Sequence, residues 1–229
     1  MSQKSQKKRR LKIIPVMIIL LVLLALYGLI RWIYTFPITN IYIEGNHYLK
    51  DQEIIELAKI DHYPSFLGTK EKNIQKHIQK NPLVFKVTVQ KKWWGTIKIK
   101  VEEYNVLFRQ YNDDQLVVLE NKKEIQDPTN QYSVPKLLNY VPDNKYNQFI
   151  KGMNQVDEDI KNLISEITYL PNEQDKDRFL LYMVDGNYVY LTLTKFKQIN
   201  YYEDVLKKLK GQKGILYLDS GNHFRIMSE

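Results

Sequence analysis

The chain has 229 residues and a formal net charge of +8 at pH 7. Six of its 34 basic residues lie among the first twelve positions; the remaining 28 Lys and Arg face 26 Asp and Glu, so most of the excess charge belongs to a short tail. A nucleic-acid-binding domain needs a basic surface of its own, so that class is excluded, and the absence of cysteine excludes disulfides, thiolate metal sites and cysteine nucleophiles.

An apolar run follows the basic tail of residues 1–12. Residues 13–30 carry no charge, and as a helix they span roughly 27 Å, close to the ~30 Å hydrocarbon layer of a bilayer. Trp32 and Tyr34 come next, where amphipathic aromatic side chains favour the headgroup layer. A cleaved signal peptide is the alternative, but no small-x-small cleavage site follows the run. We expect a transmembrane signal anchor over residues 13–34, with the N-terminus in the cytoplasm and the rest outside it.

A strand, two helices and two strands are predicted after the anchor. Residues 38–44 have strand periodicity. Asp51 and Thr69 are the expected N-caps of the two helices. Residues 85–90 and 97–102 alternate apolar and polar side chains, which indicates a sheet with one buried and one solvated face. The sequence therefore predicts a βααββ unit with both helices on one face of the sheet.

This unit resembles a POTRA domain in the order and spacing of four segments. They are Ile-Tyr-Ile-Glu-Gly-Asn at 41–46, the helix at 51–60, Asn-Pro-Leu-Val at 81–84 and the strand at 97–103. A short basic tail, one anchor and one POTRA copy directly after the membrane resemble the FtsQ/DivIB family of bacterial cell-division proteins. That family often has a Pro in the turn between the last two strands, where this chain has Trp93-Trp94-Gly95, and a Gly can also form the turn.

After the βααββ unit, the sequence predicts a mixture of strands and helices. Strands are expected at 116–119, 124–125, 179–184, 188–193, 215–218 and 223–227. Asp185-Gly186 is a strong two-residue hairpin signal. The proline-containing stretch 126–147 is predicted as an irregular connection, and the apolar spacing of 154–165 predicts a helix. Thr194 is expected to cap a late helix that ends before Gly211.

This order of elements, with the late helix and Leu-Asp-Ser-Gly at 218–221, resembles the β domain of FtsQ/DivIB proteins. The expected fold class is therefore α+β. It comprises one transmembrane helix, a βααββ POTRA domain at 36–104, and a mixed-sheet β domain with a late packed helix at 105–227.

No catalytic or metal-binding pattern is found. The four histidines are scattered without the spacing that metal ligands need, and there is no phosphate-binding loop, Gly-x-Ser-x-Gly elbow or Ser-x-x-Lys motif. Trp93 and Trp94 could stack on a sugar, or serve packing and hydrogen bonding. The sequence predicts a protein that is not an enzyme and that has no cofactor and no metal site.

The remaining interpretation is that the protein binds its partners through the shape of its surface and through open strand edges. Residues 219–227 are a candidate sheet edge, whose unpaired N–H and C=O groups can pair with a partner strand. The resemblance places the contact with coiled-coil proteins of the FtsB/DivIC type at the end of the β domain. Carried over by position, the expected partner-binding residues are Leu218, Ser220, Gly221, Phe224 and Ile226. That these residues merely close the sheet is an equally open alternative. In the POTRA unit, Trp93 and Trp94 are the expected docking residues for other division proteins.

The resemblance implies a non-catalytic scaffold of the bacterial divisome, located in the cell membrane at the division septum. Its expected partners are coiled-coil division proteins of the FtsB/DivIC and FtsL type, septal wall synthases, and the lipid bilayer through one helix. Two other classes stay open. A membrane-anchored enzyme acting on cell-wall polymer would need converging acid, base or nucleophile groups. A POTRA chaperone of protein secretion would bring tandem POTRA repeats and barrel strands.

Overall fold

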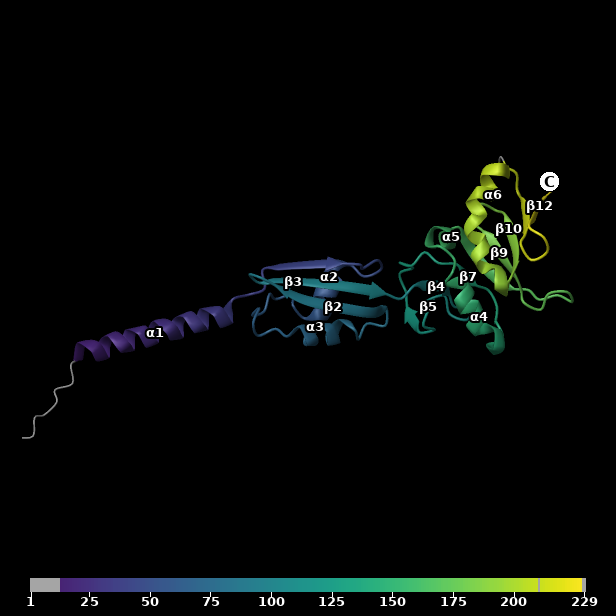
Figure 1. The fold of residues 1–229 in the computed structure, drawn as a ribbon. Coiled ribbons are helices and arrows are strands. Elements are labelled where there is room, and N and C mark those ends of the chain that lie inside the picture. The colour runs from purple at the N-terminus through teal and green to yellow at the C-terminus, as the bar shows by residue number, and fades with distance from the viewer. Residues whose placement is uncertain (1–12, 210, 228–229) are drawn as a thin grey trace, which may run out of the picture. The chain divides into compact units, whose positions relative to one another are not determined.

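The structure is a computed structural model that describes residues 13–209 and 211–227, so the basic tail expected at residues 1–12 lies outside the described residues. The chain forms two compact units (Figure 1). Of the described residues, the first contains 13–81 together with Lys86–Val101. The second contains Pro82–Phe85, 102–209 and 211–227.

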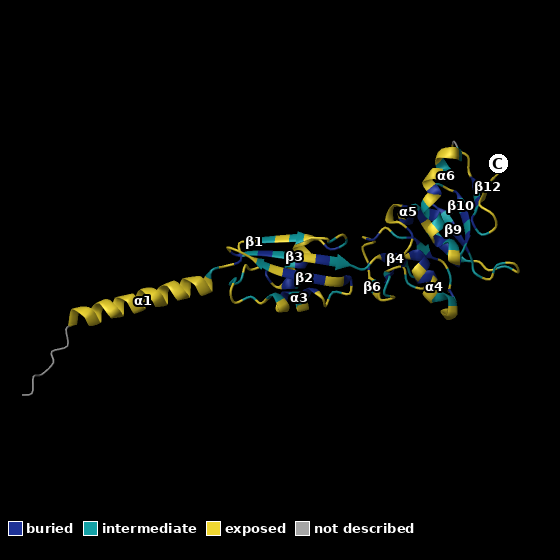
Figure 2. Cartoon of the chain, viewed as in Figure 1, coloured by how far each residue is buried: buried dark blue, intermediate teal, exposed yellow. Residues whose placement is uncertain are grey.

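Helix α1 (Ile13–Thr35) has 23 residues, none of which is buried, and it is exposed along its whole length (Figure 2). Its most apolar stretch has a mean hydropathy of 3.0. In the last turn the Thr35 hydroxyl donates to the Arg31 carbonyl at 2.9 Å and to the Trp32 carbonyl at 3.1 Å. Pro37 follows shortly after, where its missing N–H suits the end of a helix.

The rest of the first unit has the predicted βααββ order. Its elements are β1 (Asn40–Glu44), α2 (Asp51–Ala58), α3 (Glu71–Ile78), β2 (Val84–Lys92) and β3 (Thr96–Glu103). The sheet order is β1-β3-β2, and β1 pairs with β3 in parallel, with Asn40 opposite Thr96. Ile97, Ile99 and Val101 of β3 are fully buried, whereas Lys98 and Lys100 on the other face are not. Only one face of the sheet is buried, so α2 and α3 cover that face.

The helix caps differ by one residue from the prediction. The N-caps are Lys50 and Lys70, so the assignments of Asp51 and Thr69 were wrong. The carboxylate of Glu53 accepts a hydrogen bond from the backbone N–H of Lys50 at 2.8 Å. An acidic first turn therefore satisfies the start of α2 without a side-chain oxygen at the cap.

The second unit contains the remaining strands and helices. The strands are β4 (Val106–Arg109), β5 (Leu116–Leu119), β6 (Glu124–Gln126), β7 (Lys136–Leu137), β8 (Ile164–Tyr169), β9 (Arg178–Met183), β10 (Tyr188–Thr192), β11 (Gly214–Tyr217) and β12 (His223–Ile226). The helices are α4 (Asp143–Met153), α5 (Glu158–Asn162), the 3₁₀ helix η1 (Leu193–Tyr201) and α6 (Tyr202–Leu209). These strands form one nine-stranded mixed sheet, in the order β12-β11-β10-β9-β8-β7-β4-β5-β6.

One face of this sheet packs against the helices. Phe149 of α4, Phe179 of β9 and Phe196 of η1 are fully buried and meet at ring-centroid distances of 5.0–5.6 Å. Aromatic pairs at these distances add to the stability that comes from burial alone. The core thus fixes α4 and the late helix against the middle of the sheet.

Three local predictions in this unit were wrong. The helix expected at 154–165 is a short helix, α5, followed by a strand, because Ile164 and Ile167 pack into the sheet as β8. The stretch 126–147, expected to be irregular, contains β7 and the start of α4 after Pro142. The late helix begins as 3₁₀ at Leu193, with Thr192 rather than Thr194 at its N-cap. The predicted α+β fold class is nevertheless confirmed.

Candidate functional site

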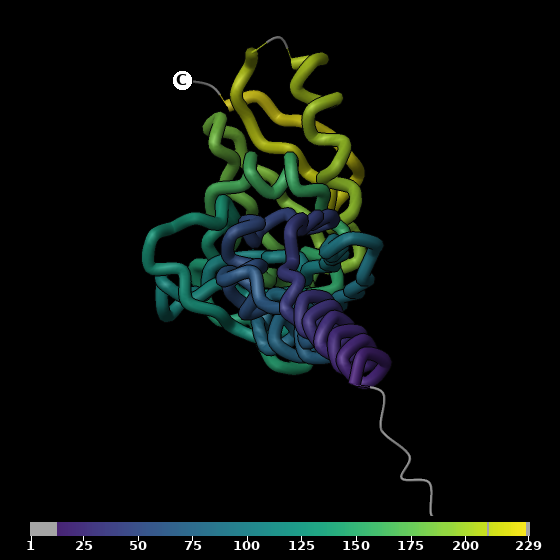
Figure 3. Tube along the Cα trace, turned by 90° about the vertical axis from the view of Figure 1, so that its left-hand side faces the viewer, coloured from purple at the N-terminus to yellow at the C-terminus, as the bar shows by residue number. Residues whose placement is uncertain are grey.

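Strand β12 lies at one edge of the nine-stranded sheet, next to β11 (Figures 1 and 3). The pairing is antiparallel, with Gly214 opposite Ile226 and Leu216 opposite Phe224. Among the residues that the structure describes, no strand pairs with the other side of β12. The second edge of the sheet is β6, which has only three residues.

The register determines which main-chain groups of β12 face outward. The N–H of Met227 donates to the carbonyl of Lys213 at 3.0 Å, which makes these two residues a hydrogen-bonded pair. Hydrogen-bonded pairs alternate with non-hydrogen-bonded pairs in an antiparallel ladder. Arg225 and His223 therefore direct their main-chain groups toward β11. Phe224 and Ile226 direct theirs toward the free side of the strand.

The side chains of β12 divide between the two faces of the sheet. Phe224 is half-buried and packs against the core. Ile226 lies on the same face, two residues along, and is 54% exposed. His223 and Arg225 are exposed on the opposite face. The edge therefore presents one exposed apolar side chain, Ile226, beside the outward main-chain groups.

The other predicted contact residues form the connection from β11 to β12. Leu218 is only 7% exposed, and its N–H donates to the carbonyl of Tyr190 at 2.7 Å. The hydroxyl of exposed Ser220 donates to the Asp219 carboxylate at 3.0 Å, and Gly221 has a φ of +113°, which favours glycine. Leu218 thus belongs to the core, while Ser220 and Gly221 shape an exposed turn beside the edge.

Gly214 allows β12 to approach β11 closely. A Cβ at this position would lie 2.2 Å from the carbonyl oxygen of Arg225 and 2.6 Å from the Phe224 ring. The N–H of Gly214 donates to the side-chain oxygen of Asn187 at 2.8 Å, and Asn187 is 1% exposed. Any larger residue would push the edge strand outward.

A buried polar network supports Asn187. Its side-chain amide donates to the Asp185 carboxylate at 2.9 Å, and the Tyr202 hydroxyl donates to the same carboxylate at 3.0 Å. Burial raises the pKa of Tyr202 above its ordinary value, and the hydrogen bond to Asp185 adds to the shift. Tyr202 therefore remains a protonated donor, which ties the start of α6 to the β9–β10 turn.

A row of stacked side chains crosses the opposite face of the sheet to β12. The Arg178 guanidinium lies 3.6 Å from the Tyr190 ring centroid. Tyr190 stacks on Tyr217 at 5.4 Å, and Tyr217 stacks on His223 at 4.7 Å. Arg178 also pairs with the Asp219 carboxylate at 2.7 Å. Cross-strand pairs of this kind stabilise neighbouring strands, so the row fixes β12 and its turn to the rest of the sheet.

Trp93 and Trp94 belong to the first unit, in the turn between β2 and β3. They are 87% and 78% exposed. Trp94 has a φ of +59° and Gly95 a φ of +72°. Of the seven predicted contact residues, the structure thus brings five together at β11 and β12 and places these two in the other unit.

Sequence reasoning did not identify Gly214, Asn187 or the row from Arg178 to His223. The apolar–polar alternation of β10 indicates that Tyr190 lies on the solvent face, so this residue of the row could have been recognised from the sequence. Gly214 directly precedes a predicted strand, where a glycine can mark a close backbone approach. The side chain of Asn187 bonds Asp185 in its own turn and Gly214, 27 positions away, and no local pattern encodes the second contact.

A shallow hollow of about 270 Å³ in the second unit is lined by tyrosine and polar residues, among them Tyr140, Asp143 and Tyr146. The Tyr140 hydroxyl donates to the Asp143 carboxylate at 2.6 Å. Burial raises the pKa of Tyr146 to about 12. Within the described residues, no three His, Asp or Glu side chains converge as they would around a metal ion.

Family models and known proteins match most of the chain. The model described as "POTRA domain, FtsQ-type" matches residues 36–104. The model described as "Cell division protein FtsQ/DivIB, C-terminal" matches residues 107–220, so β12 follows the matched segment.

Three similar relatives bear the same name. The cell division protein DivIB of Bacillus subtilis is 30% identical, over 82% of this chain and 73% of that protein. DivIB of Listeria monocytogenes is 25% identical over 82% of this chain and 72% of the relative. DivIB of Geobacillus kaustophilus is 25% identical over 82% of this chain and 74% of the relative. With both family models matched in order, the chain belongs to the FtsQ/DivIB family of cell division proteins.

Proposed function

We propose that this protein is a membrane-anchored, non-catalytic scaffold of the division machinery, and that it binds coiled-coil division proteins of the FtsB/DivIC and FtsL type through the free edge of β12. The observation that carries the proposal is the outward direction of the main-chain groups of Phe224 and Ile226. An exposed apolar side chain, Ile226, stands beside them. In this role the protein organises septal wall synthases around a common site.

Helix α1 supports the anchor. Its 23 residues, at ~1.5 Å each, span about 34 Å and exceed the ~30 Å hydrocarbon layer. No residue of α1 is buried within the chain, which suits a helix that is surrounded by lipid. The six basic residues before it favour a cytoplasmic N-terminus. Both folded units then lie outside the cytoplasm, near the division septum.

Strand addition explains how β12 would bind its partner. A partner strand alongside β12 pairs with the outward N–H and C=O groups of Phe224 and Ile226 and extends the sheet. Ile226 then contacts the partner side chain on the same face. The row from Arg178 to His223 and the close contact at Gly214 hold β12 in place before binding, so little ordering is required.

A main-chain donor can be removed from the outer side of β12 without breaking its pairing with β11. Proline at residue 226 lacks the outward N–H, while the hydrogen-bonded pairs at residues 223 and 225 stay intact. Ile226→Ala is the matched control, because it removes most of the side chain and keeps the N–H. Proline at residue 225 would remove a donor of the internal ladder and serves as the control for loss of β12 itself.

The experiment uses the full chain in lipid nanodiscs and the fluorescently labelled ectodomains of FtsL- and DivIC-type proteins. We expect I226A to weaken binding by about tenfold, because burying one such side chain contributes ~1.5 kcal/mol or more. I226P should weaken it by a further factor of about five, because it also removes one outward hydrogen bond of ~1 kcal/mol. Thermal unfolding of I226P should resemble that of the unmodified chain. Equal binding by I226P and the unmodified chain would move the contact away from this edge.

A further inference from the structure

The turn that carries Trp93 and Trp94 exposes two large aromatic side chains that have no role in the core. At 87% and 78%, these are the highest exposed fractions among the large apolar side chains of the described residues. Trp94 also adopts a φ of +59°, a conformation that costs a bulky residue free energy. The fold gains no packing from either ring, so their position points to something outside the chain.

The turn is tied directly to the segment that leaves α1. The N–H of Thr39 donates to the Gly95 carbonyl at 2.9 Å, and the Thr39 hydroxyl donates to the Trp94 carbonyl at 3.1 Å. A Cβ on Gly95 would lie 2.7 Å from the Pro37 carbonyl oxygen. Because α1 ends at Thr35 and a residue spans at most ~3.6 Å, Thr39 lies within about 14 Å of the end of the helix.

A second loop joins the same end of the unit. The N–H of Phe66 donates to the Phe36 carbonyl at 2.8 Å, and the Ser65 hydroxyl donates to the Tyr34 carbonyl. Leu67, the next residue, is 47% exposed. Together with Trp93, Trp94 and Trp32, these loops line an open apolar hollow of about 230 Å³. An apolar surface therefore continues from the last turn of α1 onto the folded unit.

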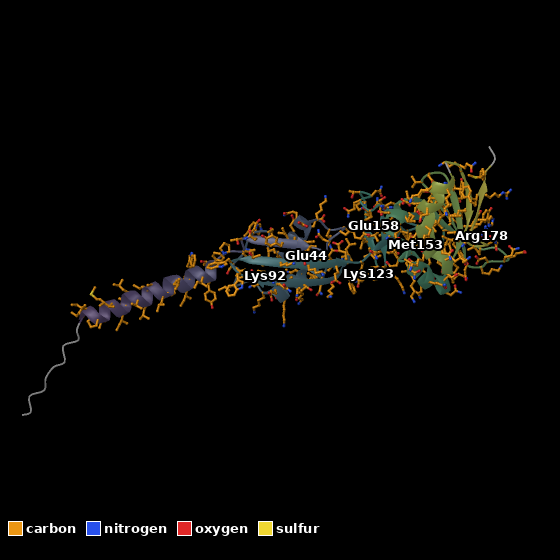
Figure 4. All side chains as sticks on the ribbon, turned by 45° about the horizontal axis from the view of Figure 1, so that its top comes forward. Glu44, Lys92, Lys123, Met153, Glu158 and Arg178 are labelled. Atoms are coloured by element: carbon orange, nitrogen blue, oxygen red, sulfur yellow. The ribbon has the colours of Figure 1, made fainter. Side chains whose placement is uncertain are left out.

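Basic groups lie beside this surface. Lys92 is exposed at the end of β2 directly before Trp93, and Figure 4 shows it at the end of the unit that faces α1. Arg31 is exposed in the last part of α1. Aromatic rings flanked by cationic side chains are the composition that favours the headgroup layer of a bilayer.

We propose that Trp93 and Trp94 insert into the headgroup layer of the bilayer that α1 spans, and that they fasten the first unit to the membrane surface at a second point. This inference rests on the proposed anchor. The occupant is lipid rather than a protein because the apolar surface is continuous with a helix of bilayer length, and because Trp32 and Tyr34 at its end occupy the same layer.

The three tryptophans of the chain provide the test. The full chain is reconstituted in vesicles of phosphatidylcholine and phosphatidylglycerol, with or without lipids brominated near the headgroup end of the acyl chains. A variant carrying Trp93→Phe and Trp94→Phe leaves Trp32 as the reporter of the anchor. A variant carrying Trp32→Phe leaves the two turn residues as reporters.

A matched control uses the other end of the same strand. Phe85 is 55% exposed and lies seven residues before Lys92, about 23 Å away at ~3.3 Å per residue. Phe85→Trp in a background without the other three tryptophans reports an aromatic side chain exposed to water. Its emission should be quenched by iodide and unchanged by brominated lipid.

We expect brominated lipid to remove most of the emission of both the Trp32 reporter and the Trp93–Trp94 reporter, and iodide to have little effect on the latter. Quenching of Trp32 combined with iodide-accessible Trp93 and Trp94 would overturn this inference and leave the anchor intact. An unquenched Trp32 would overturn the anchor and this inference together. Shielding from both quenchers would show that protein covers the turn, and would also overturn the proposal.

Discussion

Replacing Gly214 with alanine tests how closely β12 must approach β11. The new Cβ would lie 2.2 Å from the Arg225 carbonyl oxygen, whereas real Cβ contacts essentially never fall below 3.0 Å, so β12 must move outward by about 0.8 Å or more. Overpacking of this kind costs ~1–3 kcal/mol. The Phe224 ring, 2.6 Å from the same position, has to move as well, which places the expected cost toward the upper end.

Two measurements separate a local displacement from a general loss of stability. For a domain of this size, ~2–3 kcal/mol corresponds to a fall in Tm of about 6–15 °C in calorimetry. Hydrogen exchange should become faster at the amides of His223 and Arg225, whose ladder with β11 is strained. Under the proposed function, binding of coiled-coil division proteins should weaken in parallel.

Gly68→Ala is the control for adding a methyl group to a glycine. Its nearest neighbour would be a side-chain oxygen at 3.4 Å, an ordinary van der Waals distance. We expect its Tm to change by less than about 2 °C. An unchanged Tm and unchanged exchange at β12 in G214A would refute the reasoning, because the strand would then have room that the structure denies it.

Three further changes test the interior of the second unit. Asp127 is 1% exposed and accepts from Arg109 at 2.7 Å; burial alone would raise its pKa, but the Arg109 hydrogen bond and two backbone donors lower it below the ordinary value. The pair therefore stabilises the fold above about pH 4 and loses this effect as the pH falls through the folded-state pKa. Asp127→Asn should cost ~3–5 kcal/mol in urea unfolding at pH 7, and this difference should begin to shrink below about pH 4, as the pH approaches the lowered pKa of Asp127 in the folded state. Tyr202→Phe removes one donor to the Asp185 carboxylate and leaves the side-chain amide of Asn187 as the other; it should cost ~1–3 kcal/mol in thermal unfolding, so an unchanged Tm would contradict the network. Phe149→Ala removes a fully buried ring and should cost ~3–5 kcal/mol by calorimetry, and a loss below about 1 kcal/mol would mean that the aromatic core is not packed as described.

Two-residue alternation predicted the long strands well because it depends only on which face of a sheet is buried. β2 and β3 were predicted on that basis, and the β9–β10 hairpin from its Asp185-Gly186 turn. The prediction of a helix at 154–165 was wrong because a short apolar run fits either a helix or a strand. Ile160 and Ile164 are four residues apart and both buried, yet one lies in a helix and the next begins a strand.

The signal for α4 was present but was outweighed by the surrounding prolines. Tyr146, Phe149, Ile150 and Met153 have helical spacing, and Pro142 directly precedes the helix, a position that proline tolerates well. At the candidate site, the sequence predicted the edge strand but not the residues that hold it against β11. The contacts of Gly214 and Asn187 join residues up to 27 positions apart, and no local pattern encodes such distances.

The shortness of β12 limits how tightly a strand can hold to it. Phe224 and Ile226 contribute one outward N–H and one outward C=O each, so a partner strand gains at most four hydrogen bonds from them. At about 1 kcal/mol net per bond, the four main-chain bonds by themselves correspond to a Kd of about 1 mM, to which burial of the Ile226 side chain adds. With an association rate constant of ~10⁶ M⁻¹s⁻¹, such a contact lasts about a millisecond.

A contact of this kind is well occupied only at partner concentrations near or above its Kd. Confinement of both proteins to one membrane supplies that concentration without any new contact, in the same way as a linker between two binding modules. The edge would then act as a sensor of local density. It would be occupied where division proteins accumulate and vacant elsewhere along the membrane, and it would release its partner within milliseconds once the cluster disperses.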